Sequence, residues 1–122
     1  MRRPEEKEGA GHRHLRLQSL IFEELRALLR DDVTDPALTA VAITAVVLSV
    51  DYRHARVHFA LGPVSPLDGP RGNARAREEA ERALARAAPF LRARLADEIE
   101  LKRTPDLRFV FDGIATAGGE PT

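Results

Sequence analysis

The sequence predicts a single α+β domain with the element order helix, strand, strand, helix, helix, strand. Three observations support this prediction: a stripe of leucines with helical spacing near the start, two Val- and Ile-rich runs in the middle, and an Ala/Arg/Glu-rich stretch followed by an alternating apolar segment. At 122 residues and 43% hydrophobic content, the chain is large enough for one core and too short for two ordinary domains.

Composition narrows the class of protein further. The chain contains no cysteine, which excludes disulfides and thiolate metal sites and fits a cytoplasmic location. Its charged start is followed by no apolar run of the signal or membrane-spanning kind, so we expect it to be neither secreted nor associated with a membrane. Nineteen basic residues balance nineteen acidic ones, so any nucleic-acid partner must be argued from local charge.

The first helix is predicted to begin near Arg13. Residues 1–12 are charged and carry no apolar period, so they are expected to form a flexible tail. Beyond them the apolar residues recur at spacings of four, four and three, with one more leucine widening the stripe; these are Leu17, Ile21, Leu25, Leu28 and Leu20. Asp35-Pro36 ends this segment, because proline disfavours helical geometry in the residue before it.

Two strands joined by a turn at 51–54 are predicted next. The first, 41–49, is rich in Val, Ile and Thr, and strict alternation leaves both of its faces largely apolar, which favours a central strand. In the second, Ala55, Val57, Phe59 and Leu61 alternate with more polar residues. The two strands are therefore expected to form a hairpin with one half-buried face.

The C-terminal half is predicted to contain two helices and a third strand. A loop at 62–70 leads into a helix over 71–87, whose packing side would consist of Ala76, Ala80, Ala83, Leu84 and Ala87. Pro89 should interrupt it, so a second helix is expected to meet the first at Ala87-Ala88-Pro89, with a stripe of Phe90, Leu91, Leu95 and Ile99. Leu107, Phe109 and Phe111 then alternate in a strand, and residues 115–122 are expected to form a short flexible tail.

This order and its motifs resemble the ribosome-binding factor A family. The resemblance spans roughly residues 13–114 and rests on the order of several short motifs. These are Asp35-Pro36-x-Leu38, Ile43-Thr44-x-Val46-x-Leu48-Ser49-x-Asp51, Ala55-x-Val57, Phe90-Leu91-Arg92-x-x-Leu95 and Pro105-x-Leu107-x-Phe109-x-Phe111-Asp112. The chain departs from the family pattern at Ala37, where arginine is usual, and at Pro89, where the interhelical kink usually has glycine.

The resemblance implies both a fold and a function. The implied fold is a type II KH-like domain over 13–114, with a three-stranded sheet, helices packed on one face, and a kink between the two C-terminal helices. The implied function is association with the free 30S ribosomal subunit and its 16S rRNA, assisting late maturation and processing of that RNA. Such a protein acts by binding, so we expect no enzyme activity and no cofactor. Nothing in the pattern suggests a dimer seam, and we expect a monomer.

Basic residues near the predicted kink are the main candidates for RNA contact. They are Arg82, Arg86, Arg92, Arg94, Lys102 and Arg103, with Ala87, Ala88 and Pro89 as the kink itself. No acidic residue lies between Arg82 and Arg94 in the sequence, and arginine is well suited to phosphate. Composition alone favours a solvated helix face, whereas the resemblance favours an RNA-backbone surface.

The outer face of the predicted sheet is a weaker candidate. An apolar centre of Ala45, Val47, Ala60 and Val110 would be rimmed by Arg56, His58 and Arg108, and such a patch suits a base or a protein partner. Ordinary sheet surface explains the same pattern. Of the aromatic residues, only Tyr52 in the turn is expected to be free of the core.

Catalytic and metal sites are not indicated. His12-x-His14 and the pair His54 and His58 lack the carboxylates or cysteines that would complete a ligand set. Asp35 and Asp51 suit helix termination and a turn, through side-chain bonds to backbone. Thr44 and Ser49 have no base nearby in the pattern. Two alternatives to the assembly-factor interpretation stay open: a general KH-type module for single-stranded RNA, and a protein-interaction adaptor that uses the sheet face.

Overall fold

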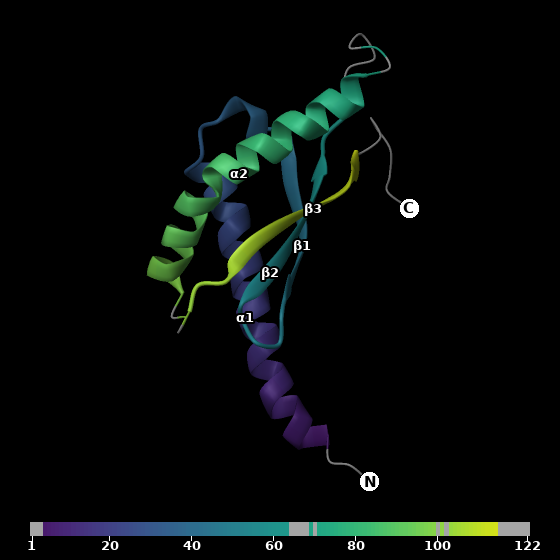
Figure 1. Cartoon of the computed structure of the whole chain (residues 1–122). Coiled ribbons are helices and arrows are strands. Elements are labelled where there is room, and N and C mark those ends of the chain that lie inside the picture. The colour runs from purple at the N-terminus through teal and green to yellow at the C-terminus, as the bar shows by residue number, and fades with distance from the viewer. Residues whose placement is uncertain (1–3, 64–68, 70, 100, 102, 115–122) are drawn as a thin grey trace.

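The computed structural model describes residues 4–63, 69, 71–99, 101 and 103–114 of the chain (Figure 1). Its elements are α1 (Pro4–Asp31), a short 3-10 helix η1 (Pro36–Leu38), β1 (Val41–Leu48), β2 (His54–Leu61), α2 (Gly72–Glu98) and β3 (Asp106–Ile114). The predicted α+β class is confirmed. The tail expected at 115–122 lies outside the described residues.

The first helix starts well before the predicted position near Arg13, because α1 already begins at Pro4. A proline at the first helical position costs no hydrogen bond, and the glutamates that follow it in the sequence complement the positive end of the helix. Residues 4–12 therefore continue the helix at backbone level, although they carry no apolar stripe. The division of the chain into a tail and a domain from residue 13 stays a prediction.

β2, and not β1, is the central strand of the sheet. The strand order is β1-β2-β3, with β1 antiparallel to β2 and β3 parallel to β2. The expectation of a central first strand is wrong because it assumes strict alternation along the strand. The register instead shifts between Ile43 and Ala45, which leaves Thr44 as the extra residue of a β-bulge. Ile43, Val46 and Leu48 all face the core as a result.

Both helices cover the same face of the sheet. The core is formed by Ile21, Leu25 and Leu28 of α1, by Val57 and Phe59 of β2, and by Leu84, Leu91 and Leu95 of α2, all at most 2% exposed. Small side chains at Ala80 and Ala83 are buried as well, so α2 approaches the core closely. Two residues assigned to apolar stripes lie outside this core, since Leu20 is 45% and Phe90 40% exposed.

The two predicted C-terminal helices are a single helix. α2 runs without interruption from Gly72 to Glu98 with Pro89 inside it, and its axis changes direction on the way (Figure 1). Proline has no N–H to donate to the carbonyl of Ala85, so the local ladder is weakened and the helix bends. It does not break, because Leu84 before the proline and Leu91 after it are both buried in the same core.

The tip of the β1–β2 hairpin is fixed by side chains of its own turn. Ser49 Oγ donates to Asp51 Oδ1 (2.7 Å), and the same oxygen accepts the Arg53 backbone N–H (3.0 Å). The predicted turn role of Asp51 is thereby confirmed. These two bonds, in that order of effect, lower the pKa of the Asp51 carboxyl. Tyr52 adopts a left-handed backbone conformation with φ 63°.

The N-terminal half of α1 docks on this hairpin. The His14 ring stacks on the ring of Tyr52 at a centroid distance of 5.6 Å, so the expectation that Tyr52 is free is wrong. His14 Nε2 lies 2.6 Å from the carbonyl oxygen of Leu48, and Gln18 Oε1 accepts the Leu48 backbone N–H (2.9 Å). Histidine and glutamine thus join the helix to the sheet through backbone groups of β1.

Candidate nucleic-acid interface

A shallow groove of about 420 Å³ runs between the bend of α2 and the start of β3. Its α2 side is formed by Ala85, Ala88, Pro89 and Arg92, and its β3 side by Asp106, Leu107 and Arg108. Small side chains at the bend keep the groove open, which suits the approach of an extended chain. Two of the three predicted kink residues therefore line one surface, while Ala87 packs partly buried against the core.

Arg92 is held at the edge of this groove by the turn that precedes β3. Its Nε donates to the carbonyl oxygen of Pro105 (3.2 Å) and its Nη2 to that of Thr104 (3.1 Å), and Nη2 also lies 3.6 Å from Asp106 Oδ1. The side chain remains 42% exposed. Arg92 thus joins α2 to β3, and its Nη1 donors have no partner among the described residues.

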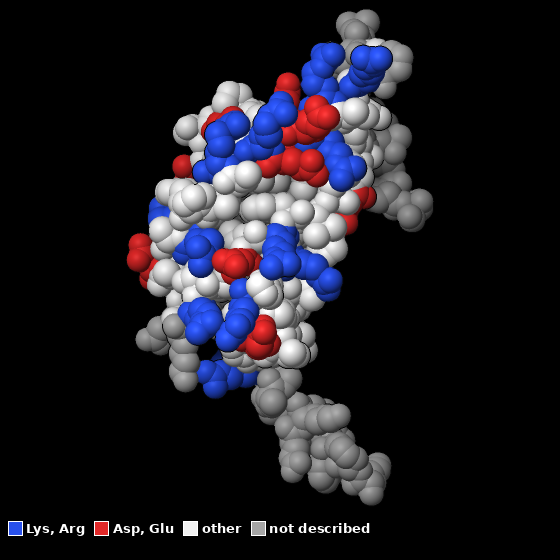
Figure 2. Space-filling model, viewed as in Figure 1, with Lys and Arg blue, Asp and Glu red and all other residues white. Residues whose placement is uncertain are grey.

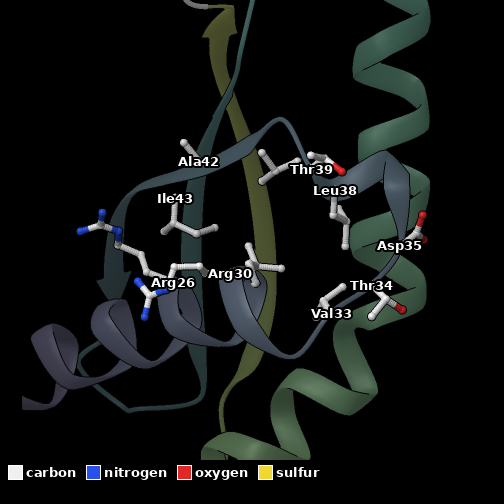
Figure 3. Close-up of a pocket in the computed structure, with 11 residues that line it drawn as sticks. Arg26, Arg30, Val33, Thr34, Asp35, Leu38, Thr39, Ala42 and Ile43 are labelled. Atoms are coloured by element: carbon white, nitrogen blue, oxygen red, sulfur yellow. The ribbon is translucent and has the colours of Figure 1, made fainter.

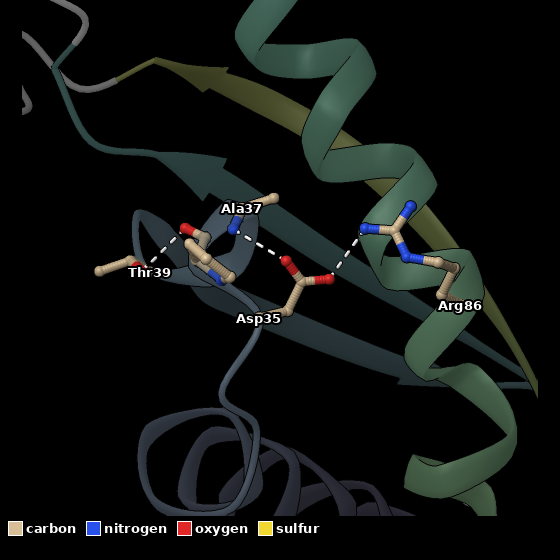
Figure 4. Close-up of polar contacts among 5 residues, drawn as sticks. Asp35, Ala37, Thr39 and Arg86 are labelled. Carbon is tan, nitrogen blue, oxygen red and sulfur yellow. Dashed lines mark hydrogen bonds and ion pairs between the residues drawn. The ribbon is translucent and has the colours of Figure 1, made fainter.

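Arg86 pairs with a carboxylate from the connection between α1 and β1 (Figure 4). Its Nη2 donates to Asp35 Oδ2 at 2.8 Å, while Asp35 Oδ1 accepts the backbone N–H of Ala37 (3.0 Å) and so caps η1. The bond from Arg86, followed by the bond from Ala37, lowers the pKa of the Asp35 carboxyl. The Arg86 side chain stays 61% exposed and uses one of its five donors in this pair.

Arg94 has more partners than the other candidates. Nη1 donates to Asp32 Oδ2 at 2.8 Å, Nη2 lies 3.6 Å from Glu98 Oε2, and the guanidinium is 5.8 Å from the centre of the Phe90 ring. These contacts tie the last turns of α2 to the end of α1. The contact with Arg94 also explains why an exposed phenylalanine is tolerated at position 90.

The remaining candidates differ in what the structure says of them. Arg82 and Arg103 are exposed and form no ion pair with a described residue, whereas Lys102 lies outside the described residues. Arg82 precedes Ala85 by three residues on α2, so it extends the line of the groove. The six predicted basic residues are therefore not one uniform patch.

Folding brings acidic residues to the arginines that the sequence keeps apart from them. Asp32, Asp35 and Asp106 come from other segments and neutralise part of the basic stretch 82–94. Figure 2 shows the result on one face of the molecule, where Lys and Arg alternate with Asp and Glu along the upper part. No local signal in the sequence could have revealed these long-range pairs.

Two features are missed by sequence reasoning. The sequence places Arg108 only on the sheet rim, but this arginine also lines the groove. A second hollow, of about 500 Å³, lies between the last turns of α1 and the first half of β1 (Figure 3). Arg26 and Arg30 lie on its α1 side and Asp35 at the end nearer α2, so its lining carries both signs of charge.

The outer sheet face has the predicted arrangement. Val47, Arg56 and Arg108 are neighbours across the three strands, and Ala45, His58 and Val110 form the next row. Asp112 accepts a hydrogen bond from Thr44 Oγ1 (2.7 Å) and lies 3.1 Å from His58 Nδ1. The contacts with His58 and then Thr44 lower the pKa of the Asp112 carboxyl.

These contacts give the polar residues of the sheet structural roles. Thr44 donates to Asp112 and Ser49 to Asp51, so neither hydroxyl is directed at a base that would activate it. Among the described residues, no three His, Asp or Glu side chains are grouped as a metal site would require. Within the same ranges, no helix is long and apolar enough to cross a membrane.

Comparison with known proteins identifies relatives over nearly the whole chain. The profile of the family described as Ribosome-binding factor A matches residues 13–120. The ribosome-binding factor A of Heliobacterium modesticaldum is 39% identical over 103 residues, which cover 84% of this chain and 78% of that protein.

Solved structures of similar proteins share the fold. The crystal structure of ribosome-binding factor A from Thermus thermophilus is 29% identical, with a TM-score of 0.56 over 83% of this chain and 92% of that one. Coordinates of the Thermus thermophilus factor fitted into a cryo-electron microscopy map of its 30S complex give 28% identity and a TM-score of 0.59, over 77% of this chain and 89% of that one.

Proposed function

The chain belongs to the ribosome-binding factor A family, and from this we propose that it binds the free 30S ribosomal subunit through 16S rRNA and assists late maturation and processing of that RNA. The observation that carries the proposal is the similarity to the Thermus thermophilus factor in its 30S complex. The fold that was fitted to the subunit in that complex covers most of this chain.

The protein would act by binding and not by bond chemistry. A rigid surface that fits one conformation of the rRNA better than another shifts the RNA toward the favoured conformation by the difference in affinity. Contacts to phosphates would position the protein, and the ends of the rRNA would be trimmed by separate nucleases once the favoured conformation is reached. The same reasoning predicts a cytoplasmic protein without a cofactor.

The groove at the bend of α2 is the surface we assign to RNA contact. Arg82 and Arg108 are exposed and form no ion pair with a described residue, so their guanidinium groups are available to phosphate. Arg86 and Arg92 are held in place by protein partners and keep free donors, which suits a preorganised contact. Arg94, with two carboxylates and a ring around it, is expected to contribute least.

Replacing two groove arginines tests the proposal. The double variant Arg82→Gln/Arg108→Gln should bind purified 30S subunits more weakly, and the slope of log affinity against log salt should fall by about 1.5, since each phosphate contact contributes about 0.7 to 0.9. Binding is measured by sedimentation with subunits over a salt series. The matched control is Arg16→Gln/Arg75→Gln, which removes two exposed arginines outside the groove. Equal affinity and slope in both double variants would contradict the assignment.

The alternatives make different predictions in the same experiment. A general single-stranded RNA module would bind free RNA as tightly as 30S subunits. A protein-interaction adaptor that uses the outer sheet face would be indifferent to Arg82 and to the salt concentration. A preference for free 30S subunits over translating ribosomes distinguishes the assembly factor from both.

A further inference from the structure

A second concave site lies at the hairpin end of the sheet, beyond the groove at the bend of α2. It has a volume of about 460 Å³ and lies where the first half of α1, the β1–β2 turn and the segment before β3 come together. Arg13, Arg53 and Arg103 line it, one from each of these segments, together with Tyr52. We refer to it as the hairpin pocket.

Charge is the first property that distinguishes the hairpin pocket. Its three arginines are exposed, and none forms an ion pair with a described residue. The one carboxylate in the lining, Asp51, already accepts hydrogen bonds from Ser49 and from the backbone of Arg53. Three positive charges against one negative charge leave an excess of two around one hollow. Like charges gathered in this way destabilise a fold unless an anion lies between them.

The second property is an apolar floor beside a fixed aromatic ring. Leu48 and Pro105 are buried beneath the pocket, and Leu17 is partly buried. Tyr52 is fixed by its stacking on His14, by the hydrogen bond from its backbone N–H to the Ser49 carbonyl (2.9 Å), and by a left-handed conformation that is uncommon for a residue other than glycine. An apolar surface with an aromatic ring suits the flat face of a base.

We infer that the hairpin pocket binds one unstacked nucleotide of RNA, with the base against Tyr52 and the leucines and the phosphate among Arg13, Arg53 and Arg103. The volume lies within the range of pockets that hold small ligands. Proteins that recognise single-stranded RNA combine these two elements, a stacking surface and cationic groups for the backbone. The inference rests on the proposed function for the source of the nucleotide, and it adds a site separate from the groove.

The composition of the chain provides a selective probe. Tyr52 is its only tyrosine. Biosynthetic labelling with 3-fluorotyrosine therefore gives one fluorine NMR resonance, located in the hairpin pocket. The titrants are uridine and adenosine 5′-monophosphate, a single-stranded oligouridine, inorganic phosphate and a poly-glutamate peptide.

The expected result is a saturable shift of this resonance with the nucleotides and more tightly with the oligonucleotide. The triple variant Arg13→Gln/Arg53→Gln/Arg103→Gln should bind about tenfold more weakly, from the loss of three exposed charge contacts. The control Arg16→Gln/Arg75→Gln should match the wild type. An unmoved resonance, or an equal shift with inorganic phosphate or poly-glutamate, would overturn the inference in favour of an empty pocket, a simple anion site or a site for acidic protein.

Failure of this inference is distinguishable from failure of the proposed function. If wild-type protein sediments with 30S subunits but its fluorine resonance does not respond to RNA, the proposed function stands and the hairpin pocket is overturned. If the resonance responds but no subunit binding is found, the pocket stands as an RNA site and the ribosomal assignment is lost.

Discussion

Asp35 shows how one side chain can position a surface. The sequence predicts that it ends the first helix, but α1 ends at Asp31 and Asp35 instead caps η1 through the backbone N–H of Ala37. Its other carboxylate oxygen accepts the bond from Arg86 on α2. The residue therefore fixes the connection between α1 and β1 and also orients an arginine next to the bend of α2.

The lowered pKa of Asp35 predicts an acid-dependent loss of stability. Because the carboxyl pKa is below its ordinary value of 3.8 in the folded protein, its contribution is complete above about pH 4 to 5 and is lost as the pH falls through the folded-state pKa. Asp35→Asn should lower the urea midpoint at pH 7, and the difference from the wild type should shrink toward pH 3. The measurement is urea unfolding followed by circular dichroism at pH 7, 5, 4 and 3.

The control for this pH series is Asp97→Asn. Asp97 is an exposed carboxylate with no hydrogen-bond partner in the described part of the chain, so its replacement should leave the midpoint nearly unchanged. A difference between Asp35→Asn and the wild type that stays constant from pH 7 to pH 3 would show that the lost contact is not one of ionised carboxylate.

At the scale of elements, α2 shows what a sequence pattern reveals and what it leaves open. Pro89 correctly indicates a change of direction in the helix, but a break into two helices does not follow. Whether a proline breaks a helix or bends it depends on burial on both sides, which is a property of the folded core. Leu84 and Leu91 supply that burial and keep α2 continuous.

Replacing this proline tests the cause of the bend. Pro89→Ala restores a donor to the Ala85 carbonyl and should raise the free energy of unfolding by up to about 3 kcal/mol, the difference between the two residues in a helix interior. The same change should straighten α2 and weaken binding to 30S subunits, since the groove is formed at the bend. The measurements are chemical denaturation and sedimentation with subunits.

Ala88→Ser is the comparison for Pro89→Ala, because it alters the groove surface without changing the backbone donor. Unchanged stability in Pro89→Ala would indicate that packing, and not the missing donor, sets the bend. Retained subunit binding together with raised stability would indicate that the bend is not required for the contact.

The strands and the interface contacts were predictable to different degrees. Local patterns found all three strands and the hairpin, because β2 alternates cleanly from Ala55 to Leu61. They placed β1 in the centre of the sheet because the bulge at Thr44 breaks the alternation, and a bulge leaves no mark in hydrophobicity alone. The pairs Arg86–Asp35 and Arg94–Asp32 join residues distant in sequence, so the charge balance of the surface required the fold.

At the scale of the whole molecule, the absence of net charge limits how the protein meets RNA. Nineteen basic and nineteen acidic residues give no long-range attraction, so association depends on a few local contacts. The groove and the hairpin pocket together offer arginines that form no ion pair with a described residue. The molecule thus resembles neither a uniformly basic RNA-binding protein nor an acidic one.

A moderate salt dependence follows from this distribution. Three to five phosphate contacts predict a slope of about 2 to 4.5 for log affinity against log salt, and so a loss of about 20- to 500-fold between about 50 and 200 mM salt. The test is titration of 30S subunits with fluorescently labelled protein at four salt concentrations. A slope near zero would contradict an RNA interface, and a slope near 10 would require contacts far beyond the two sites.

The docking of α1 on β1 also bears on self-association. β1 is an edge strand, and an exposed edge presents unpaired N–H and C=O groups on which another chain can form a sheet. Gln18 accepts the N–H of Leu48 and His14 lies against its carbonyl oxygen, so the last ladder position of this edge is already occupied. The bulge at Thr44 interrupts the same edge further along. One helix that completes the core thereby also discourages edge-to-edge aggregation of the protein.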